Sequence, residues 1–390
     1  MDSPAAIRPT VCEIDLHALC ANARLISQAA GAPIVAVVKA DAYGHGALAV
    51  ARTLARQPEV CGFAVNMIEE AIGLRDGGID DFVLVMGPTL AGGYDDIVGH
   101  HLTPMLSCIA DIDGVHEAAA RRGCQVPVHL YIDTGMGRLG FAPADAEALA
   151  DRLAARPNLR VTGLGTHMAC ADIDDPHDPD CMTHRQLARF ADARMSFTRA
   201  LRAAGVLAAG QACVHHLANS ATALRFPGVG GDFVRVGLAL YGNGAGPRDP
   251  TLGALRPVMR LSTRVAQIRT VAVGESVSYG ALFRATRTTT VAVLPLGYAD
   301  GVPRRATGRA EVLIHGRRCP VIGAITMGII MADITDMPAP VRVGDPVVIF
   351  GERDGARISV AEFAGWAGRI EYEVTCSVSA RVPRVYVGQA

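Results

Sequence analysis

Short runs of apolar and β-branched residues recur along the first 245 residues, with helical spacing between most of them. The run IVAVVKA at 34–40 lies between Pro33 and the breaker-rich DAYGHG, a pattern typical of a buried strand that ends at residue 39. Similar runs follow at 60–67, 81–88, 102–108, 126–133, 161–168, 213–219 and 233–241. Helical spacing is clearest at 45–57, 67–76, 144–156 and 182–204 and weaker at 89–101. Eight strands alternating with helices predict an α/β fold, a (β/α)8 barrel.

Length and charge narrow the class of protein. A chain of 390 residues indicates about two domains, and the 50% apolar content is enough for large cores. The formal charge of -1 provides no excess positive field, so we expect neither nucleic acid nor an anionic membrane as a partner. The chain has no signal-like start, no long apolar run and no H-E-x-x-H motif. We therefore expect a cytoplasmic protein without a metal site.

Lysine usage is the sharpest feature of the composition. Of the 37 basic residues, 36 are arginines, and the single lysine is Lys39, at the end of the first predicted barrel strand. Arginine can replace lysine as a surface cation, but it cannot lose its proton, form an imine or act as an amine base. Lys39 is therefore a candidate for chemistry that only an amine can perform.

Polar residues follow the other predicted strands at the same rim, where barrel enzymes place their active sites. Tyr43 lies just beyond Lys39, and the fifth strand runs into DTGMGR, which ends at Arg138. The remaining candidates are His167, Asn219, Ser220, Arg235 and Gly237. Phosphate groups are commonly held after strands seven and eight of such barrels, where Asn219, Ser220 and Gly237 fall. A phosphate-bearing aldehyde beside one lysine suggests pyridoxal 5'-phosphate, held by Lys39 as an imine. Ser220 is equally suited to an N-cap of the next helix.

The chain resembles the pyridoxal-phosphate-dependent alanine racemases along nearly its whole length. The matching motifs include AVVKADAYGHG, DTGMGRLG, HLANSATAL, RVGLALYG, SVSYG, LPLGYADG and YEVTCSVSARVPRVYV, in that order. The resemblance implies a barrel over 12–245 and a mostly β C-terminal domain over 246–390, joined by the extended segment 1–11. Residues 262–350 are rich in Val, Ile and Thr, with turns such as His315-Gly316-Arg317, as expected for such a domain.

The resemblance also implies a role for each site residue. Lys39 would hold the cofactor and act as one base, and Tyr279 would be the opposing base across a homodimer interface. Arg235 would face the pyridine nitrogen. His167 would pack by the ring and help orient Arg235, and His216 would lie below the ring. Tyr43, Ser220, Gly237 and Tyr372 would hold the phosphate, with Asn219 beside them. Arg138 and the backbone N–H of Met327 would bind the carboxylate of a small amino acid.

Several positions depart from the family pattern, among them Glu371, where proline is common. Tyr131 stands where many members have a lysine that supports the carboxylate-binding arginine, Ala324 stands for an arginine, and Gly328 stands for an aspartate. These changes favour, as an alternative, a racemase relaxed toward serine or larger amino acids. A non-catalytic cofactor-binding protein would lack the C-terminal domain, and a decarboxylase of this fold would need an acidic residue in place of Arg235.

Overall fold

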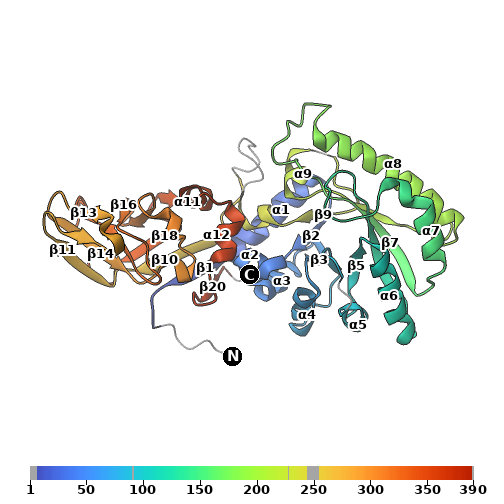
Figure 1. Ribbon diagram of the computed structural model, residues 1–390, viewed down its shortest axis with the longest axis horizontal. Coiled ribbons are helices and arrows are strands. Elements are labelled where there is room, and N and C mark those ends of the chain that lie inside the picture. The colour runs from blue at the N-terminus through green and yellow to red at the C-terminus, as the bar shows by residue number, and fades with distance from the viewer. Residues whose placement is uncertain (1–6, 90–91, 227, 244–253, 389–390) are drawn as a thin grey trace. The chain divides into compact units, whose positions relative to one another are not determined.

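A computed structural model describes residues 7–89, 92–226, 228–243 and 254–388 (Figure 1). The chain divides into two compact units. The barrel unit comprises Leu19–Ala42 and Ala47–Arg256, and the C-terminal unit comprises Met1–Ala18, Tyr43–Gly46 and Pro257–Ala390. The domain boundary expected between residues 245 and 246 lies outside the described residues.

The barrel unit contains the eight predicted strands, all parallel. In sheet order they are β8 (Val214–His216), β7 (Leu159–Gly165), β6 (Val126–Tyr131), β5 (Thr103–Leu106), β4 (Val83–Val85), β3 (Val60–Val65), β2 (Ile34–Val37) and β9 (Val234–Val236). Pairing of β2 with β9 brings the two ends of the sequence pattern together, so the sheet is a nearly closed barrel. The (β/α)8 prediction is confirmed.

Helices lie around the outside of these strands (Figure 1). They are α1 (Leu16–Ala30), α3 (Ala47–Leu54), α4 (Ile68–Asp76), α5 (Tyr94–Gly99), α6 (Ile109–Arg121), α7 (Ala146–Ala154), α8 (Met182–Ala203) and α9 (Ser220–Arg225). Most residues of these strands are buried because the barrel interior covers one face and the helices cover the other. No helix within the described residues is long and apolar enough to cross a membrane.

Two local predictions were wrong. The first strand ends at Val37, two residues before Lys39. The backbone N–H of Val38 still donates to the carbonyl of Ala64 on β3, and the backbone turns left-handed from Ala40. The N-cap of α9 is Asn219, not Ser220, since the Asn219 side chain accepts from the N–H of Thr222 at 3.0 Å. An amide oxygen at the N-cap satisfies an N–H of the first helical turn.

The C-terminal unit is built around a ten-stranded sheet. Along the path of hydrogen-bonded neighbours, nine strands are β11 (Gln267–Val271), β14 (Thr289–Leu294), β17 (Ile330–Asp333), β16 (Arg317–Ile322), β15 (Glu311–Ile314), β18 (Pro346–Arg353), β10 (Met259–Arg264), β1 (Val11–Asp15) and β20 (Arg384–Val387). β19 (Ala356–Ile358) pairs with β18 off this path. The predicted turn at His315-Gly316 joins β15 to β16, with both residues at positive φ, as a type I′ hairpin requires.

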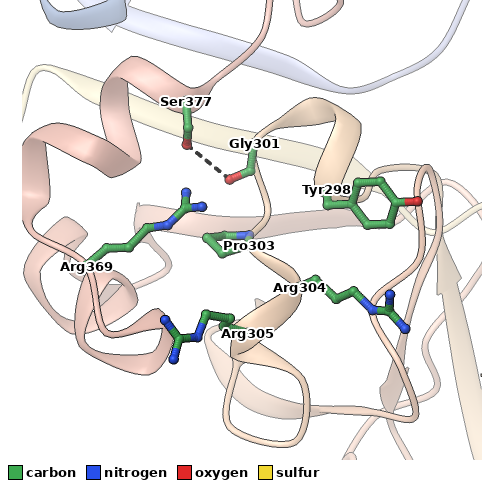
Figure 2. Close-up of a pocket in the computed structure, with 7 residues that line it drawn as sticks. All are labelled: Tyr298, Gly301, Pro303, Arg304, Arg305, Arg369 and Ser377. Atoms are coloured by element: carbon green, nitrogen blue, oxygen red, sulfur yellow. Dashed lines mark hydrogen bonds between the residues drawn. The ribbon is translucent and has the colours of Figure 1, made fainter.

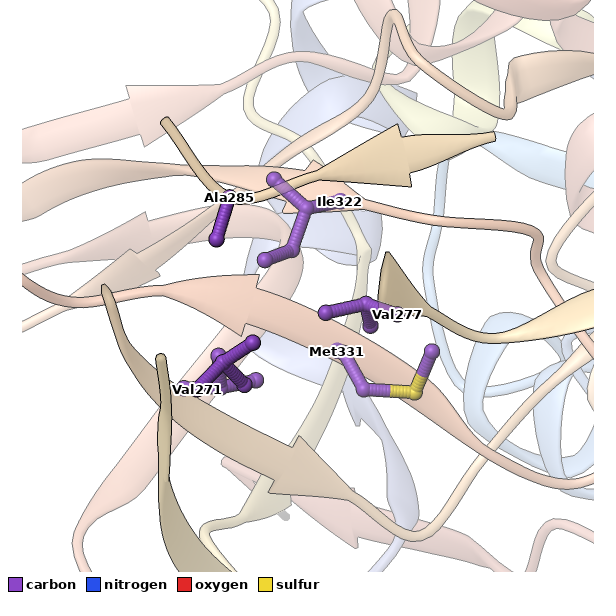
Figure 3. Packing of buried hydrophobic residues seen from close by; sticks show 6 residues of the cluster. Val271, Val277, Ala285, Ile322 and Met331 are labelled. Atoms are coloured by element: carbon purple, nitrogen blue, oxygen red, sulfur yellow. The ribbon is translucent and has the colours of Figure 1, made fainter. Parts of the chain in front are cut away.

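A small apolar core in this unit supports the segment that carries Tyr279 (Figure 3). Its members are Val271, Val277, Ala285, Val291, Ile322 and Met331. Val277 ends β12 (Ser276–Val277), which pairs with β13 (Phe283–Arg284), and the short turn between them begins at Tyr279. The Ser278 hydroxyl donates to the carbonyl of Ala324 at 2.8 Å, which ties the start of this turn to the sheet.

Gly44 occupies a position that no larger residue fits. Its φ is +83°, and an added Cβ would lie 2.2 Å from the carbonyl oxygen of Thr375 in the same unit. We expect Gly44→Ala to lower the free energy of unfolding by about 2–4 kcal/mol. Gly78→Ala is the matched control, because Gly78 has a φ of +81° but nothing within 4 Å of the added Cβ. Gly78→Ala should lower the free energy of unfolding by only about 1 kcal/mol. If denaturant unfolding gave the same loss of stability for both variants, the close approach of Thr375 to Gly44 would be contradicted.

Candidate active site

Lys39 begins a left-handed helical turn. The segment α2 (Lys39–Gly44) has helical hydrogen bonding, but Ala40, Asp41, Ala42 and Tyr43 all have φ between 51° and 55°. Left-handed backbone costs residues with a Cβ roughly 1–2 kcal/mol each, and it rarely persists beyond one residue. The Asp41 carboxylate accepts from the N–H of Ala47 at 2.7 Å, which joins the turn to the start of α3. The lysine therefore projects from a strained segment that its surroundings must hold.

Arg235 is a buried cation near the end of β9, and it contacts two of the other predicted site residues. One Nη donates to Nδ1 of His216, and the other donates to the carbonyl of Thr166 at 2.5 Å and lies 3.3 Å from Nδ1 of His167. Burial lowers the pKa of Arg235 to about 10, so it stays charged at neutral pH. The structure thus joins strands β7, β8 and β9 through one guanidinium group.

A chain of two neutral histidines extends from Arg235 into the barrel. Because arginine only donates hydrogen bonds, Nδ1 of His216 must accept, and its proton lies on Nε2. That nitrogen is 2.9 Å from Nδ1 of His129, to which it donates. Burial and the charge of Arg235 lower the pKa of His129 to about 3 and hold the pKa of His216 well below its usual value. The chain therefore fixes one tautomer for each ring.

These two histidines predict an acid-sensitive barrel. Each stays neutral in the folded protein, whereas the unfolded chain gains a proton at each near pH 6.5. Their contribution to stability is complete above that pH. It falls by up to about 1.4 kcal/mol per pH unit for each histidine as the pH drops toward the depressed folded values. We expect His129→Gln to reduce this slope in denaturant unfolding measured between pH 7 and pH 5. His177→Gln, at an exposed site, should leave the slope unchanged.

Ser220 and Gly237 form the predicted phosphate corner of the barrel. The Ser220 hydroxyl oxygen accepts from the N–H of Gly237 at 3.1 Å and from the N–H of Ala239 at 3.4 Å. Its own proton is left to donate. Asn219 donates to the carbonyl of Met168 at 3.2 Å while capping α9, so it holds the corner in place. The loops after β8 and β9 therefore meet where barrel enzymes bind phosphate.

Arg138 and Met327, which are predicted to bind the carboxylate, both lie at exposed positions. Arg138 is exposed, and its guanidinium makes no hydrogen bond or ion pair within the described residues. The Asp133 carboxylate accepts from the N–H groups of Gly135, Met136 and Gly137 and so shapes the loop before Arg138. In the C-terminal unit Met327 is 59% exposed, and its carbonyl accepts from the N–H of Ala299.

The C-terminal unit holds the predicted tyrosines. Tyr43 and Tyr372 lie together, with ring centroids 6.0 Å apart, and Tyr372 belongs to α12 (Glu371–Ser377). Tyr279 is 75% exposed. Leu282 at 67%, Met327 and Ile329 are also exposed in this unit. Large exposed apolar groups of this kind are typical of a surface that another protein covers.

A cavity of about 520 Å³ in the C-terminal unit contains none of the predicted site residues (Figure 2). It is lined by Tyr298, Gly301, Pro303, Arg304, Arg305, Arg369 and Ser377. Ser377 donates to the carbonyl of Gly301 at 3.4 Å at one edge. Three arginines and no carboxylate give this cavity a positive potential that attracts small anions.

Sequence reasoning missed two buried residues that organise the barrel rim. His129 lies inside β6 and contacts His216, and the 2.9 Å contact spans 87 residues of sequence. Gln186 on α8 is buried, donates to the carbonyl of His167 at 3.0 Å and accepts from the N–H of Ala169 at 2.8 Å. A polar residue on the buried face of a predicted helix was the available signal for Gln186.

Sequence comparison with known proteins covers nearly the whole chain. The model of the alanine racemase N-terminal domain matches residues 14–244, and that of the C-terminal domain matches residues 258–386. The alanine racemase of Sorangium cellulosum is 40% identical, over 97% of this chain and 99% of its own length. That of Symbiobacterium thermophilum is also 40% identical, over 98% of each chain. The chain belongs to the alanine racemase family.

Solved structures of alanine racemases have the same fold. The enzyme from Streptomyces lavendulae, which produces D-cycloserine, superposes with a TM-score of 0.88 at 33% identity and covers 100% of this chain and 99% of its own. The enzyme from Streptomyces coelicolor A3(2) gives 0.88 at 36% identity, with 99% of each chain covered. The protein is therefore an isomerase of the alanine racemase family. The alternatives of a shifted substrate, a non-catalytic protein or a decarboxylase are not favoured.

The barrel residues fit the cofactor that alanine racemases use. Nε of Arg235 is buried and has no hydrogen-bond partner within the described residues, although both Nη atoms are satisfied. A buried donor of this kind requires an acceptor. An unprotonated pyridine nitrogen is such an acceptor, and the phosphate corner at Ser220 suits the other end of pyridoxal phosphate. The Tyr131 hydroxyl, where many alanine racemases have a lysine, is also buried without a partner in the described chain.

Proposed function

We propose that this protein interconverts L- and D-alanine with pyridoxal 5'-phosphate bound to Lys39. Membership of the alanine racemase family supports the reaction, and the buried Nε of Arg235 supports the cofactor. When bound, pyridoxal phosphate withdraws electrons from the α-carbon of the amino acid, so the α-proton can be removed. All ten cysteines of the described chain are thiols rather than disulfides, which suits a cytoplasmic location.

Arg235 sets the electronic character of the proposed site. Its charge disfavours protonation of the pyridine nitrogen, which moderates electron withdrawal and limits side reactions such as transamination. His216 at the end of β8 and His167 just after β7 hold the guanidinium from two sides of Arg235. Ser220, Gly237, Tyr43 and Tyr372 are the proposed phosphate ligands, with Asn219 holding the corner.

Arg138 and the N–H of Met327 are the proposed carboxylate ligands. The parallel N–H groups of a guanidinium match the two oxygens of a carboxylate. Because the Arg138 guanidinium makes no hydrogen bond within the described residues, it need not break one to bind the substrate. Alanine is the proposed substrate because the relatives are alanine racemases.

Racemisation needs a proton removed from one face of the α-carbon and another delivered to the opposite face. We propose Lys39 for one face and Tyr279 of the partner subunit for the other. The exposure of Tyr279, Leu282 and Met327 supports a homodimer in which a second copy covers this surface.

A chiral assay tests the proposed function. Purified protein with pyridoxal phosphate should convert either enantiomer of alanine to a 1:1 mixture and exchange the α-hydrogen for solvent deuterium. A product that has lost carbon dioxide would contradict the proposal, as would unchanged L-alanine alongside turnover of another amino acid.

A further inference from the structure

Glu70 has one hydrogen bond that its local role does not explain. Glu70 lies in the first turn of α4, and its Oε2 accepts from the N–H groups of Asn66 and Met67 at 2.8 and 3.0 Å. These two contacts cap the helix. Its Oε1 accepts from the N–H of Ala40 at 2.6 Å, thirty residues earlier in the chain. One carboxylate thus binds a helix start with one oxygen and a different segment with the other.

Ala40 is the first left-handed residue after Lys39. Its φ is 51°, and its side chain is exposed, so no burial of its methyl group compensates for the steric cost. The Glu70 contact instead satisfies its backbone N–H. Hydrogen bonds to an ionised acceptor are roughly twice as strong as those between neutral groups. The shortest of the three contacts of Glu70 is made at the first residue of the left-handed turn.

We propose that Glu70 is a positioning residue that holds the left-handed turn and thereby fixes the direction in which Lys39 leaves the barrel. The proposal rests on the proposed function in that Lys39 is taken as the cofactor-binding lysine. Both carboxylate oxygens are needed, because each binds a different segment. A glutamine has one acceptor oxygen, and its NH2 group would face an N–H on one of the two sides.

Glu69 provides a matched control on the same helix turn. It is exposed and makes no hydrogen bond or ion pair within the described residues. Hydrogen exchange followed by mass spectrometry of the holoenzyme reports on the peptide that contains residues 39–46. We expect exchange there to be at least about tenfold faster in Glu70→Gln and Glu70→Ala. Glu69→Gln should match the unmodified protein. Equal exchange rates for this peptide in all of these proteins would show that Glu70 does not hold the turn.

Cofactor titration tests positioning separately from tethering. We expect Glu70→Ala to raise the pyridoxal phosphate concentration at half-saturation of the visible absorbance by about tenfold or more. Adding Ala40→Gly should recover part of this loss, because glycine adopts a φ of 51° without a Cβ clash. Faster exchange with unchanged half-saturation would show a tether that does not position Lys39 and would overturn the proposal.

The outcomes for Glu70 and for Lys39 can be told apart. Borohydride reduction followed by peptide mapping shows which residue carries the cofactor, whatever the effect of Glu70→Ala. A tag on the Lys39 peptide together with unchanged exchange in Glu70→Ala would refute the Glu70 proposal alone. A tag elsewhere would refute the proposed cofactor lysine, and with it any role of Glu70 in positioning that lysine.

Discussion

Lys39→Arg should abolish both visible cofactor absorbance and racemisation, with a loss of activity on the order of 10⁴-fold. Arginine keeps the positive charge and much of the length of the side chain, but it cannot lose its proton or bond covalently to an aldehyde. The chain has no other lysine, so no neighbouring side-chain amine can take over. Absorbance spectra and a chiral assay of the purified variant measure the two effects.

Because Lys39 is the only lysine, peptide mapping can assign the bound cofactor to one side chain. After borohydride reduction, the unmodified protein should carry the cofactor mass on the one tryptic peptide with an uncleaved Lys39. In Lys39→Arg, only the α-amino group remains as a primary amine. Far-UV circular dichroism should be unchanged, since Lys39 is only half-buried and lies beyond the end of β2. Retention of the visible band by the variant would show that the cofactor is held elsewhere.

The sequence predicted the barrel because its signal is local and repeated. Each strand is a short β-branched run bounded by breakers, and eight such runs leave little choice of fold. Lys39 stood out in the composition as the one side-chain amine among 36 arginines, and its position at the end of a predicted buried strand made it a candidate. Both signals depend on residue type and order, and neither depends on knowing which distant residues meet.

The features that were missed depend on contacts or on backbone conformation. The His129 to His216 contact joins positions 87 residues apart, and a lone histidine in a strand gives no sign of its partner. The left-handed turn at Ala40 to Tyr43 runs against the backbone preference of its two alanines and its tyrosine. Such a turn forms only because distant groups hold it, Glu70 among them. Local propensity therefore predicted a strand up to Lys39, where the structure has already left the sheet.

Tyr279→Phe should slow racemisation by about 10²–10⁴-fold while leaving exchange of one enantiomer largely intact. Removing the hydroxyl removes one proton carrier and keeps the ring. Lys39 can still take and return a proton on its own face of the α-carbon. One enantiomer of alanine should therefore exchange its α-hydrogen with solvent deuterium without inverting, as NMR in deuterium oxide would show. Equal loss of exchange for both enantiomers would contradict the two-base assignment.

Mixed dimers decide whether Tyr279 acts across subunits. Equal amounts of Lys39→Ala and Tyr279→Phe chains, unfolded and refolded together, should pair at random, so half of the dimers contain one of each. If the site takes Tyr279 from the partner subunit, each mixed dimer has one intact site and one site with both defects. About a quarter of the unmodified activity should then return. A site built within one chain would give no intact site in any pairing, and the mixture would stay as inactive as its components.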